Sequence, residues 1–272
     1  MNFRNHTRKT MPTTTLFPTL TLFLMMAFLP PLAAQTGAID SQVFRWEEAP
    51  LETTATGERR QILEGSSTHF SWLEVHATTL EPGTAPHASH SHSDQEELII
   101  VKSGLIQVSI AGDTQLLGPG SIALAIPGDE HGIFNAGDET ATYYVMRYRS
   151  RAPMDTARAR AAGGSFMVDF TDLEFHETGK GGVRRYFNRP TAMCEYFEMH
   201  VTTLNEGLKS HDPHTHLAEE IILMMKGSTE EQIEDGFHPA TVGDLIFLAS
   251  DIPHAIQNTG KGQAQYFAFQ WR

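Results

Sequence analysis

One block of the sequence occurs twice. HATTL at 76–80 recurs as HVTTL at 200–204, and the glycines, histidines and one asparagine that follow recur at nearly the same separation. The matched pairs are Gly83 with Gly207, His87 with His211, His90 with His214, His92 with His216, Gly104 with Gly227, Gly120 with Gly243, His131 with His254, and Asn135 with Asn258. Self-similarity of this kind indicates that the chain carries two copies of one domain.

Each copy has the pattern of β structure. Short apolar or alternating runs are separated by glycine-containing turns, which is typical of strands in a sandwich or barrel. The runs of the first copy lie at 98–101, 105–110, 121–126 and 140–148, and those of the second at 221–225, 244–249 and 263–271. We therefore expect an all-β chain of two similar domains.

The boundaries follow from the repeat. We expect a first domain at 35–150, a linker at 151–164 and a second domain at 165–272. The linker region, Arg149–Gly164, is rich in Arg and Ala, and we predict a helical turn at Thr156–Ala162. Residues 35–56 form an arm that we expect to add a strand.

The first 34 residues have the layout of a secretory signal peptide. The N-terminal region is basic, with Arg4, Arg8 and Lys9. An apolar run at 16–32 follows it, and the small residues Ala33 and Ala34 then resemble a cleavage region. We predict cleavage near Ala34 and a secreted or periplasmic protein with no membrane association afterwards. A retained membrane anchor is the alternative, although the uninterrupted apolar part is shorter than the ~20 residues of a spanning helix.

Composition narrows the function classes. The net charge of −13 argues against nucleic acid as a partner. The single cysteine, Cys194, excludes an intramolecular disulfide and an all-cysteine metal site, and we expect it to be a small core residue. The chain has 14 histidines, and histidine is the commonest protein metal ligand.

Four of these histidines form two pairs with metal-ligand spacing. His90 and His92 share one face of a strand, as do His214 and His216. A glutamate and a third histidine complete each set, which gives His90, His92, Glu97 and His131 in the first copy and His214, His216, Glu220 and His254 in the second. Three imidazoles and a carboxylate suit Mn, Fe, Co, Ni, Cu or Zn, so we expect up to two divalent transition-metal ions per chain.

The same residues resemble the cupin superfamily. Its first motif is G-x5-H-x-H-x3,4-E-x6-G, and its second is G-x5-P-x-G-x2-H-x3-N. Both copies match, with one extra residue before each histidine pair, Pro127 displaced by one position, and Pro253 in place of the second copy's Pro-x-Gly turn. The resemblance implies two tandem jelly-roll barrels, a bicupin, with metal held by the eight residues above.

Two adjacent glutamates compete for the ligand position in each copy. The number of residues between the glutamate and Gly104 favours Glu97, whereas the number of residues between His92 and the glutamate favours Glu96. We favour Glu97, and Glu219 is the equivalent competitor of Glu220 in the second copy.

Several flanking residues recur in both copies. His87 and His211 are candidates for acid–base catalysis or for polar positions on the rim of a loop. For His76 and His200 we expect outward or interdomain packing. Arginine pairs precede both copies at 59–60 and 184–185, and for Arg60 and Arg184 a structural role is favoured over contact with an anionic substrate.

Strand alternation predicts the pocket walls. The residues in step with the glutamates, or two positions after the third histidine, are apolar: Ile99, Val101, Ile133, Ile222, Met224 and Ile256. A mainly apolar pocket around a metal is a usual small-molecule site. The resemblance implies a metal-dependent enzyme of dioxygenase, decarboxylase or isomerase type acting on a small organic acid or phenolic compound. The alternative is a non-catalytic module that binds a small molecule or sugar, and self-association stays open for both.

Overall fold

The computed structural model describes residues 1–2 and 37–272, so the signal peptide predicted at 1–34 lies outside the described residues except for its first two. The described residues 37–272 belong to one compact unit. Within the described part of the chain, no helix has the length and apolarity needed to cross a membrane.

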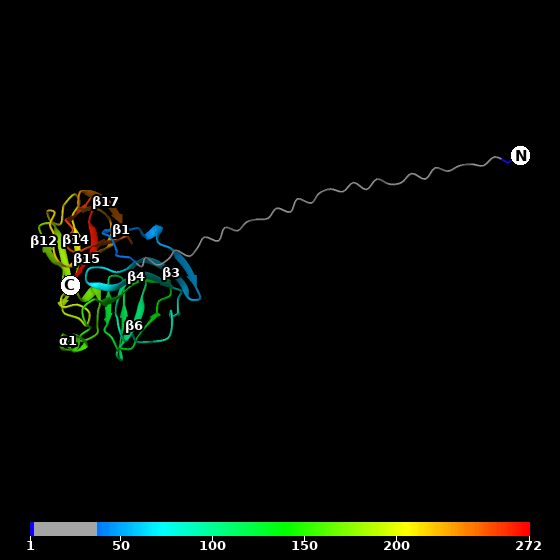
Figure 1. Cartoon of the computed structure of the whole chain (residues 1–272), viewed down its shortest axis with the longest axis horizontal. Coiled ribbons are helices and arrows are strands. Elements are labelled where there is room, and N and C mark those ends of the chain that lie inside the picture. Colours follow the sequence, from blue (N-terminus) through cyan, green and yellow to red (C-terminus); the bar gives the residue numbers. More distant parts are fainter. Residues whose placement is uncertain (3–36) are drawn as a thin grey trace. The chain divides into compact units, whose positions relative to one another are not determined.

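The all-β prediction is confirmed, and each half of the unit pairs a seven-stranded antiparallel sheet with a three-stranded one (Figure 1). The larger sheet of the first barrel has the order β11 (Phe166–Val168), β8 (Ile122–Ala125), β5 (Glu96–Ser103), β10 (Ala141–Ser150), β4 (Phe70–Leu80), β3 (Gly57–Gly65), β2 (Leu51–Thr54). Its smaller sheet has the order β7 (Asp113–Leu117), β6 (Ile106–Ile110), β9 (His131–Asn135).

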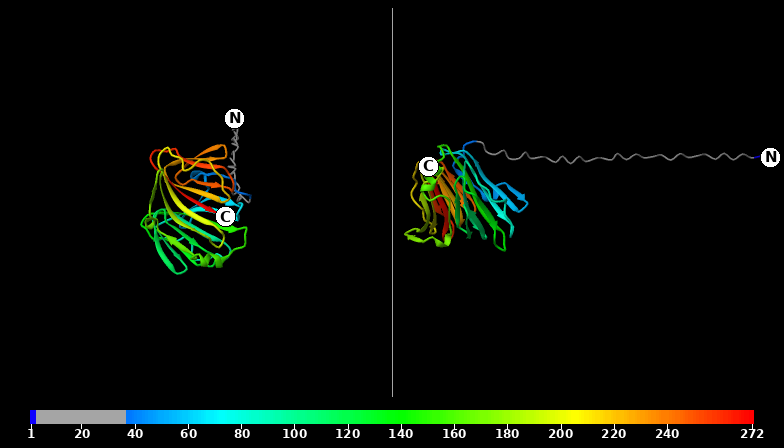
Figure 2. Two further views of the ribbon diagram at one scale, coloured as in Figure 1. Left: turned by 90° about the vertical axis from the view of Figure 1, so that its left-hand side faces the viewer. Right: turned by 90° about the horizontal axis from the view of Figure 1, so that it is seen from below.

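The second barrel repeats this arrangement, and the two barrels lie side by side (Figure 2). Its larger sheet has the order β1 (Gln42–Phe44), β18 (Leu245–Leu248), β15 (Glu219–Lys226), β20 (Ala264–Trp271), β14 (Phe197–Leu204), β13 (Gly181–Arg189), β12 (His176–Thr178). Its smaller sheet has the order β17 (Gly236–Thr241), β16 (Ser228–Ile233), β19 (His254–Asn258).

The two halves exchange their first strands. The N-terminal arm does add strands, but β1 pairs with β18 in the second barrel, whereas β11 pairs with β8 in the first. In Figure 1 the blue β1 accordingly lies beside the strands of the C-terminal half. Each exchanged strand becomes the new edge of the sheet that it joins, and because it is only three residues long it offers little for unwanted strand pairing.

A short 3-10 helix follows each exchanged strand, η1 (Trp46–Glu48) after β1 and η2 (Phe170–Asp172) after β11. The rings of Trp46 and Phe170 pack against Gly243 and Gly120, where a Cβ atom would lie 3.0 Å and 2.8 Å from the nearest ring atom. Both glycines also have positive φ angles. The repeat keeps these glycines because each must admit an aromatic ring from the opposite half.

The main hydrophobic core lies between the barrels rather than inside either one. Phe70 of the first half stacks on Trp271 of the second, with ring centroids 5.1 Å apart, and on Tyr148 at 4.7 Å. Cys194 is buried in the same core as a free thiol, as expected. Each barrel also has a smaller core of its own.

The linker contains the predicted helical turn, α1 (Thr156–Ala161). Asp155 caps it by accepting a hydrogen bond from the Arg158 backbone N–H, which satisfies one of the amides that a helix start leaves free. The turn carries the chain from β10 to β11.

Candidate metal centres

The first predicted ligand set converges at one end of the first barrel. His90 and His92 lie in the loop between β4 and β5, Glu97 is the second residue of β5, and His131 is the first residue of β9. One ligand atom from each of the four residues lies within 4.8 Å of the others. Glu97 is 3.2 Å from His92 Nε2 and 3.5 Å from His131 Nε2.

The second set is similar but more open. Its three histidines, His214, His216 and His254, bring their ligand atoms within 4.8 Å of one another. Glu220 lies 3.2 Å from His216 Nε2 and 3.4 Å from His254 Nε2. His214 is exposed, whereas its counterpart His90 is half-buried.

The tautomers of the third histidines suit a metal. His131 Nδ1 donates to the Asp129 carbonyl oxygen at 3.0 Å, and His254 Nδ1 donates to that of Ile252 at 2.8 Å. The proton on Nδ1 leaves a lone pair on Nε2, and both Nε2 atoms are buried without a hydrogen-bond partner among the described residues. A cation at the centre of each cluster would satisfy these orphaned atoms, so the donor sets fit a divalent transition metal.

The protonation states also fit. Burial alone would raise the pKa of Glu97, but the imidazoles of His131 and His92 outweigh it and hold that pKa far below its usual range. Burial and the neighbouring imidazoles lower the pKa of His90, and likewise that of His214. In the second set the pKa of Glu220 falls to about 2, because His216 and His254 outweigh the effect of burial. At neutral pH the clusters therefore contain ionised carboxylates and, at His90 and His214, neutral imidazoles.

The structure separates the adjacent glutamates. Glu96 and Glu219 point away from the clusters and connect the two halves of the chain. Glu96 accepts hydrogen bonds from the Thr191 hydroxyl and the Ala192 N–H, both at 2.7 Å. Glu219 accepts one from the Ser67 hydroxyl at 2.6 Å, among other donors of the first half.

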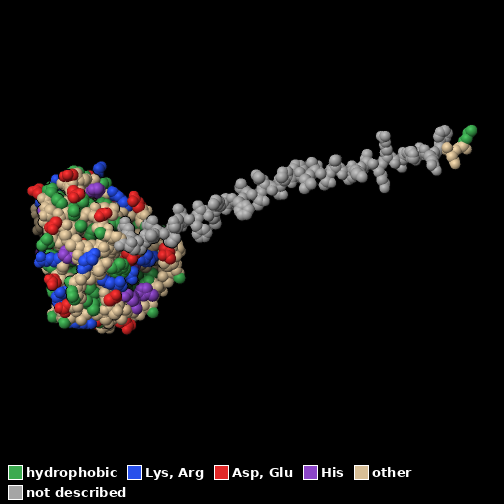
Figure 3. Space-filling view, in the orientation of Figure 1, with side chains coloured by type: hydrophobic (Ala, Val, Ile, Leu, Met, Phe, Trp, Pro, Cys, Tyr) green, Lys and Arg blue, Asp and Glu red, His purple; other side chains and the backbone are tan. Residues whose placement is uncertain are grey.

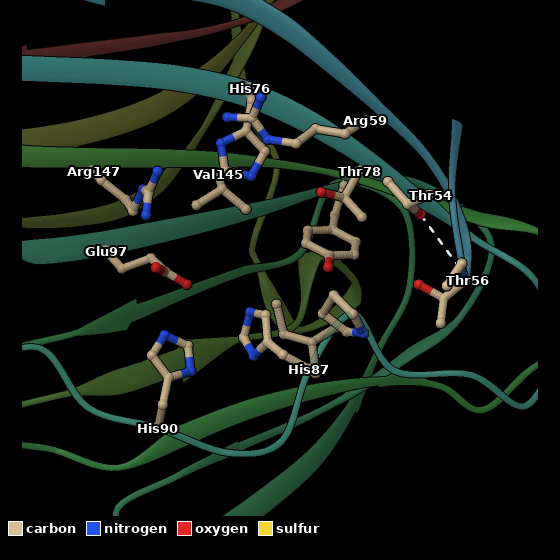
Figure 4. A pocket seen from close by; sticks show the side chains of 14 residues that line it. Thr54, Thr56, Arg59, His76, Thr78, His87, His90, Glu97, Val145 and Arg147 are labelled. Atoms are coloured by element: carbon tan, nitrogen blue, oxygen red, sulfur yellow. Dashed lines mark hydrogen bonds between the residues drawn. The ribbon is translucent and has the colours of Figure 1, made fainter. Parts of the chain in front are cut away.

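A cavity of about 320 Å³ opens beside the first cluster (Figure 4). In the close view, Glu97 lies between His90 on one side and Arg147 and His76 on the other, and His87 lies next to His90. Its lining comprises Thr54, Ala55, Thr56, Arg59, His76, Thr78, Pro86, His87, His90, Glu97, Ile133, Tyr143, Val145 and Arg147. In the space-filling view, histidine side chains gather on the surface of the same barrel (Figure 3).

A buried carboxylate organises the cationic side of this cavity. Glu74 accepts hydrogen bonds from Arg59 at 2.6 Å, His76 at 2.7 Å and Arg147 at 2.9 Å. Burial would raise the pKa of Glu74, but His76 and Arg147 lower it overall. Two guanidinium groups against one carboxylate leave a net positive charge beside the metal cluster.

The prediction of mainly apolar pocket walls is wrong for this cavity. Ile133 lines it, but Ile99 and Val101 are fully buried in the core of the first barrel, and Ile222, Met224 and Ile256 in that of the second. Strand alternation correctly predicted that these side chains point into the barrels, but it could not predict that they lie deep in the cores and away from the cavity surface. The mouth is built instead by polar residues of β3, β4, β10 and the β2–β3 turn.

The recurring histidines divide between the pocket and its rim. His87 is an exposed lining residue whose ring centroid lies 4.4 Å from that of His90, and His211 lies 4.1 Å from His214 in the same way. The expectation of outward or interdomain packing is wrong for His76, which is buried in the pocket wall. His200 pairs with Glu198 at 3.3 Å.

The two Arg-Arg pairs, 59–60 and 184–185, are not equivalent residue for residue. The β-ladders place Arg60 opposite Ala77 and Arg184 opposite Val201, which makes Arg60 and Arg184 equivalent. Both have the favoured structural role: Arg60 lies over the Trp46 ring and Arg184 over the Phe170 ring.

Arg59 and Arg147, which the sequence analysis missed, differ between the barrels. The position of Arg59 is held by Val183 in the second barrel, and that of Arg147 by Gln270, which donates to Glu220 at 3.1 Å. The sequence did contain a signal for these two arginines, because a residue-by-residue comparison of the two copies shows that neither is repeated in the second copy. The second site therefore keeps its histidines but has neither guanidinium group.

Comparison with protein-family models matches the cupin domain twice, at residues 76–147 and 200–269. The chain belongs to the cupin family. Since each match covers one barrel and each barrel carries one histidine cluster, this cupin is a bicupin.

Solved structures show the same fold at low identity. The E. coli protein YlbA is 16% identical, with a TM-score of 0.65 over 88% of this chain and 93% of that one. AerE from Microcystis aeruginosa is 14% identical, with a TM-score of 0.64 over 82% and 97%. A Lactobacillus farciminis oxalate decarboxylase in complex with formate is 15% identical, with a TM-score of 0.65 over 88% of each chain. A search of the curated proteins found no match.

Proposed function

We propose that this bicupin is a metal-dependent enzyme that acts on a small carboxylic acid bound in the first barrel. The observation that carries the proposal is the meeting of two guanidinium groups and a four-residue metal cluster at one cavity. Guanidinium groups bind carboxylates through paired, charge-assisted hydrogen bonds. The arrangement favours an organic acid over a neutral phenolic compound.

The residues of the first barrel have separable roles. His90, His92, Glu97 and His131 would hold a divalent metal, which supplies Lewis-acid catalysis and open coordination positions when bound. Arg59 and Arg147 bind the substrate carboxylate, and Glu74 fixes the direction of both guanidinium groups. Holding the acid in one orientation beside the metal lowers the entropic part of the barrier.

His87 is the candidate for proton transfer. It lines the cavity, is exposed, and lies next to His90 without belonging to the four-residue cluster. Its Nδ1 lies 3.0 Å from the Ala88 carbonyl oxygen, which leaves Nε2 to exchange a proton with substrate. His211 occupies the same position at the second site.

The second barrel supports metal binding without the same substrate specificity. With Val183 and Gln270 in place of the two arginines, it lacks the paired guanidinium groups of the first barrel, and a cation near His211 is the single ammonium group of Lys180, which donates to the Ser210 carbonyl oxygen at 2.8 Å. We assign turnover to the first barrel and a supporting metal site to the second.

The test is metal analysis by mass spectrometry, followed by oxygen-consumption and carbon-dioxide assays with oxalate, other small carboxylic acids, catechols and flavonols. Turnover of a carboxylic acid and of no phenolic compound is expected. Tight metal binding with no turnover of any substrate would instead favour the alternative function, a ligand-binding module.

Export is part of the proposal. The basic start, apolar run and small-residue exit of residues 1–34 support a signal peptide cleaved near Ala34. N-terminal sequencing of secreted or periplasmic protein should begin close to Gln35. Material beginning at Met1 would contradict export by cleavage.

A further inference from the structure

A second cavity of about 320 Å³ lies where the two barrels meet. Its buried floor comes from three matched pairs of residues, Ile100 with Leu223, Val101 with Met224, and Tyr144 with Phe267. Each pair occupies equivalent positions in the two copies, so the cavity sits on the pseudo-symmetry that relates the barrels. None of its lining residues lines the cavity beside the first metal cluster.

The cavity opens between exposed apolar residues. Pro119 and Val242, a further matched pair, lie at its rim and are exposed. A rim and floor of this kind, enclosing a volume within the ~300–1,000 Å³ of small-molecule sites, suit an apolar group of moderate size.

Two lysines are the only charged side chains among the described residues that line this cavity. Lys102 is half-buried and Lys226 is exposed, and no carboxylate side chain is among the lining residues. Within residues 37–272 neither ammonium group forms an ion pair or a side-chain hydrogen bond. Lys102 Nζ lies over the Trp46 ring, 4.7 Å from its centroid.

The environment of Lys102 favours an added negative charge. Burial lowers the pKa of this lysine, and the positive charge of Arg60 lowers it further against the opposing effect of Glu47. In a chain with a net charge of −13, two lysines without an ion pair beside an apolar cavity are unusual. An anion bound there would add to the partial compensation that Glu47 and the Trp46 ring give Lys102.

We propose that this interbarrel cavity binds an amphiphilic monocarboxylate, with the apolar body between the matched floor residues and the carboxylate against Lys102 and Lys226. The site is separate from the metal centres and does not depend on the function proposed for them. A ligand that contacts both halves stabilises their association in the folded chain.

The duplication supplies conservative variants for the test. The position of Lys102 is held by Met225 in the second barrel, and that of Lys226 by Ser103 in the first. The double variant Lys102→Met with Lys226→Ser therefore introduces only residues that the fold already accepts at the equivalent positions. Lys261→Met, an exposed lysine outside this cavity, is the matched control.

Binding of decanoate to the full mature protein is measured by titration calorimetry, with decanol and acetate as probes that lack the charge or the apolar body. Decanoate should bind more tightly than either, and the double variant should weaken its binding at least about tenfold. Lys261→Met should leave its affinity unchanged. Equal affinity of the double variant and the unaltered protein, or no binding of decanoate, would overturn the proposal.

The cationic cavity of the first barrel could also attract a carboxylate, so a second pair of variants separates the two sites. Arg59→Val with Arg147→Gln should leave decanoate affinity unchanged while it lowers kcat/KM for the small carboxylic acid. Loss of decanoate binding in this variant, with binding retained in the lysine variant, would place decanoate in the first barrel and overturn the interbarrel site.

Discussion

Glu96 and Glu97 are neighbours on β5 whose carboxylates lie on opposite faces of the sheet. Glu97 joins the histidine cluster inside the first barrel, whereas Glu96 accepts hydrogen bonds from Thr191 and Ala192 of the other half. Because successive side chains on a strand alternate between its faces, one pair of residues both binds the candidate metal and connects the barrels.

Substitution of these two glutamates should have different consequences. Glu97→Gln should reduce the metal content of the first barrel with little loss of stability. Glu96→Leu should leave metal binding intact. It would leave the Thr191 hydroxyl and the Ala192 N–H buried without an acceptor, which should lower the free energy of unfolding by about 1–3 kcal/mol for each donor. Metal analysis and chemical denaturation of both variants check this, and loss of metal in Glu96→Leu alone would contradict the assignment.

Removal of two ligands should empty one site only. His90→Ala with His92→Ala is expected to remove about one metal ion per chain, because the second cluster draws no ligand from the first barrel. His214→Ala with His216→Ala is the matched variant. If either pair of substitutions empties both sites, the centres are not independent.

The two arginines should govern substrate affinity. Arg59→Val and Arg147→Gln install the residues of the second barrel, and each removes charge-assisted hydrogen bonds worth about 1.5–3 kcal/mol. We expect kcat/KM to fall roughly tenfold to a hundredfold for each, with metal content unchanged. Replacement of Arg60, which stacks on Trp46, should lower stability and leave KM unaffected.

Metal affinity should fall as the pH falls. Glu220 raises the pKa of His216, and Glu97 raises that of His131 against the effect of burial, so protons compete for these nitrogens. A protonated imidazole has no lone pair to donate, and we expect metal release as the pH drops through ~6.5. Dialysis at a series of pH values followed by metal analysis measures the release. Full retention well below this range would argue against coordination mainly by histidine.

A buried carboxyl group in the second barrel should be a stability defect. Both oxygens of Glu231 are buried without a hydrogen-bond partner among the described residues, and burial raises its pKa well above the usual value, with Glu220 adding to the shift. Its ladder position, opposite Ile256, is that of Val108 in the first barrel. Glu231→Val should therefore stabilise the protein by about 1–3 kcal/mol.

The pH dependence gives a second measurement on Glu231. A raised carboxyl pKa means that the folded state holds the proton more tightly, so this residue destabilises the fold increasingly as the pH rises above ~4.3. Unfolding by denaturant at pH 5 and pH 8 should show that Glu231→Val gains more stability at the higher pH. An equal or smaller gain there would contradict the buried, unpartnered assignment.

Local rules account for most of what could be read from the sequence. Alternating runs and glycine turns predicted the strands, and the repeated His-x-His spacing predicted which side chains converge. Asn135 and Asn258 recur because each donates to the carbonyl oxygen of the last residue of a neighbouring strand, Leu80 or Leu204. Such features recur because they depend on geometry within one copy of the fold.

The remaining features depend on contacts between residues far apart in the chain. The exchange of β1 and β11, the burial of Glu96 and Glu219 between the barrels, and the turn of Arg59 and Arg147 towards one cavity each involve partners from different strands or different halves. Strand periodicity gives the face on which a side chain lies but neither its depth nor its neighbour across the fold. Packing of the two barrels decided which partners Glu96 and Glu219 meet and where the pocket opens.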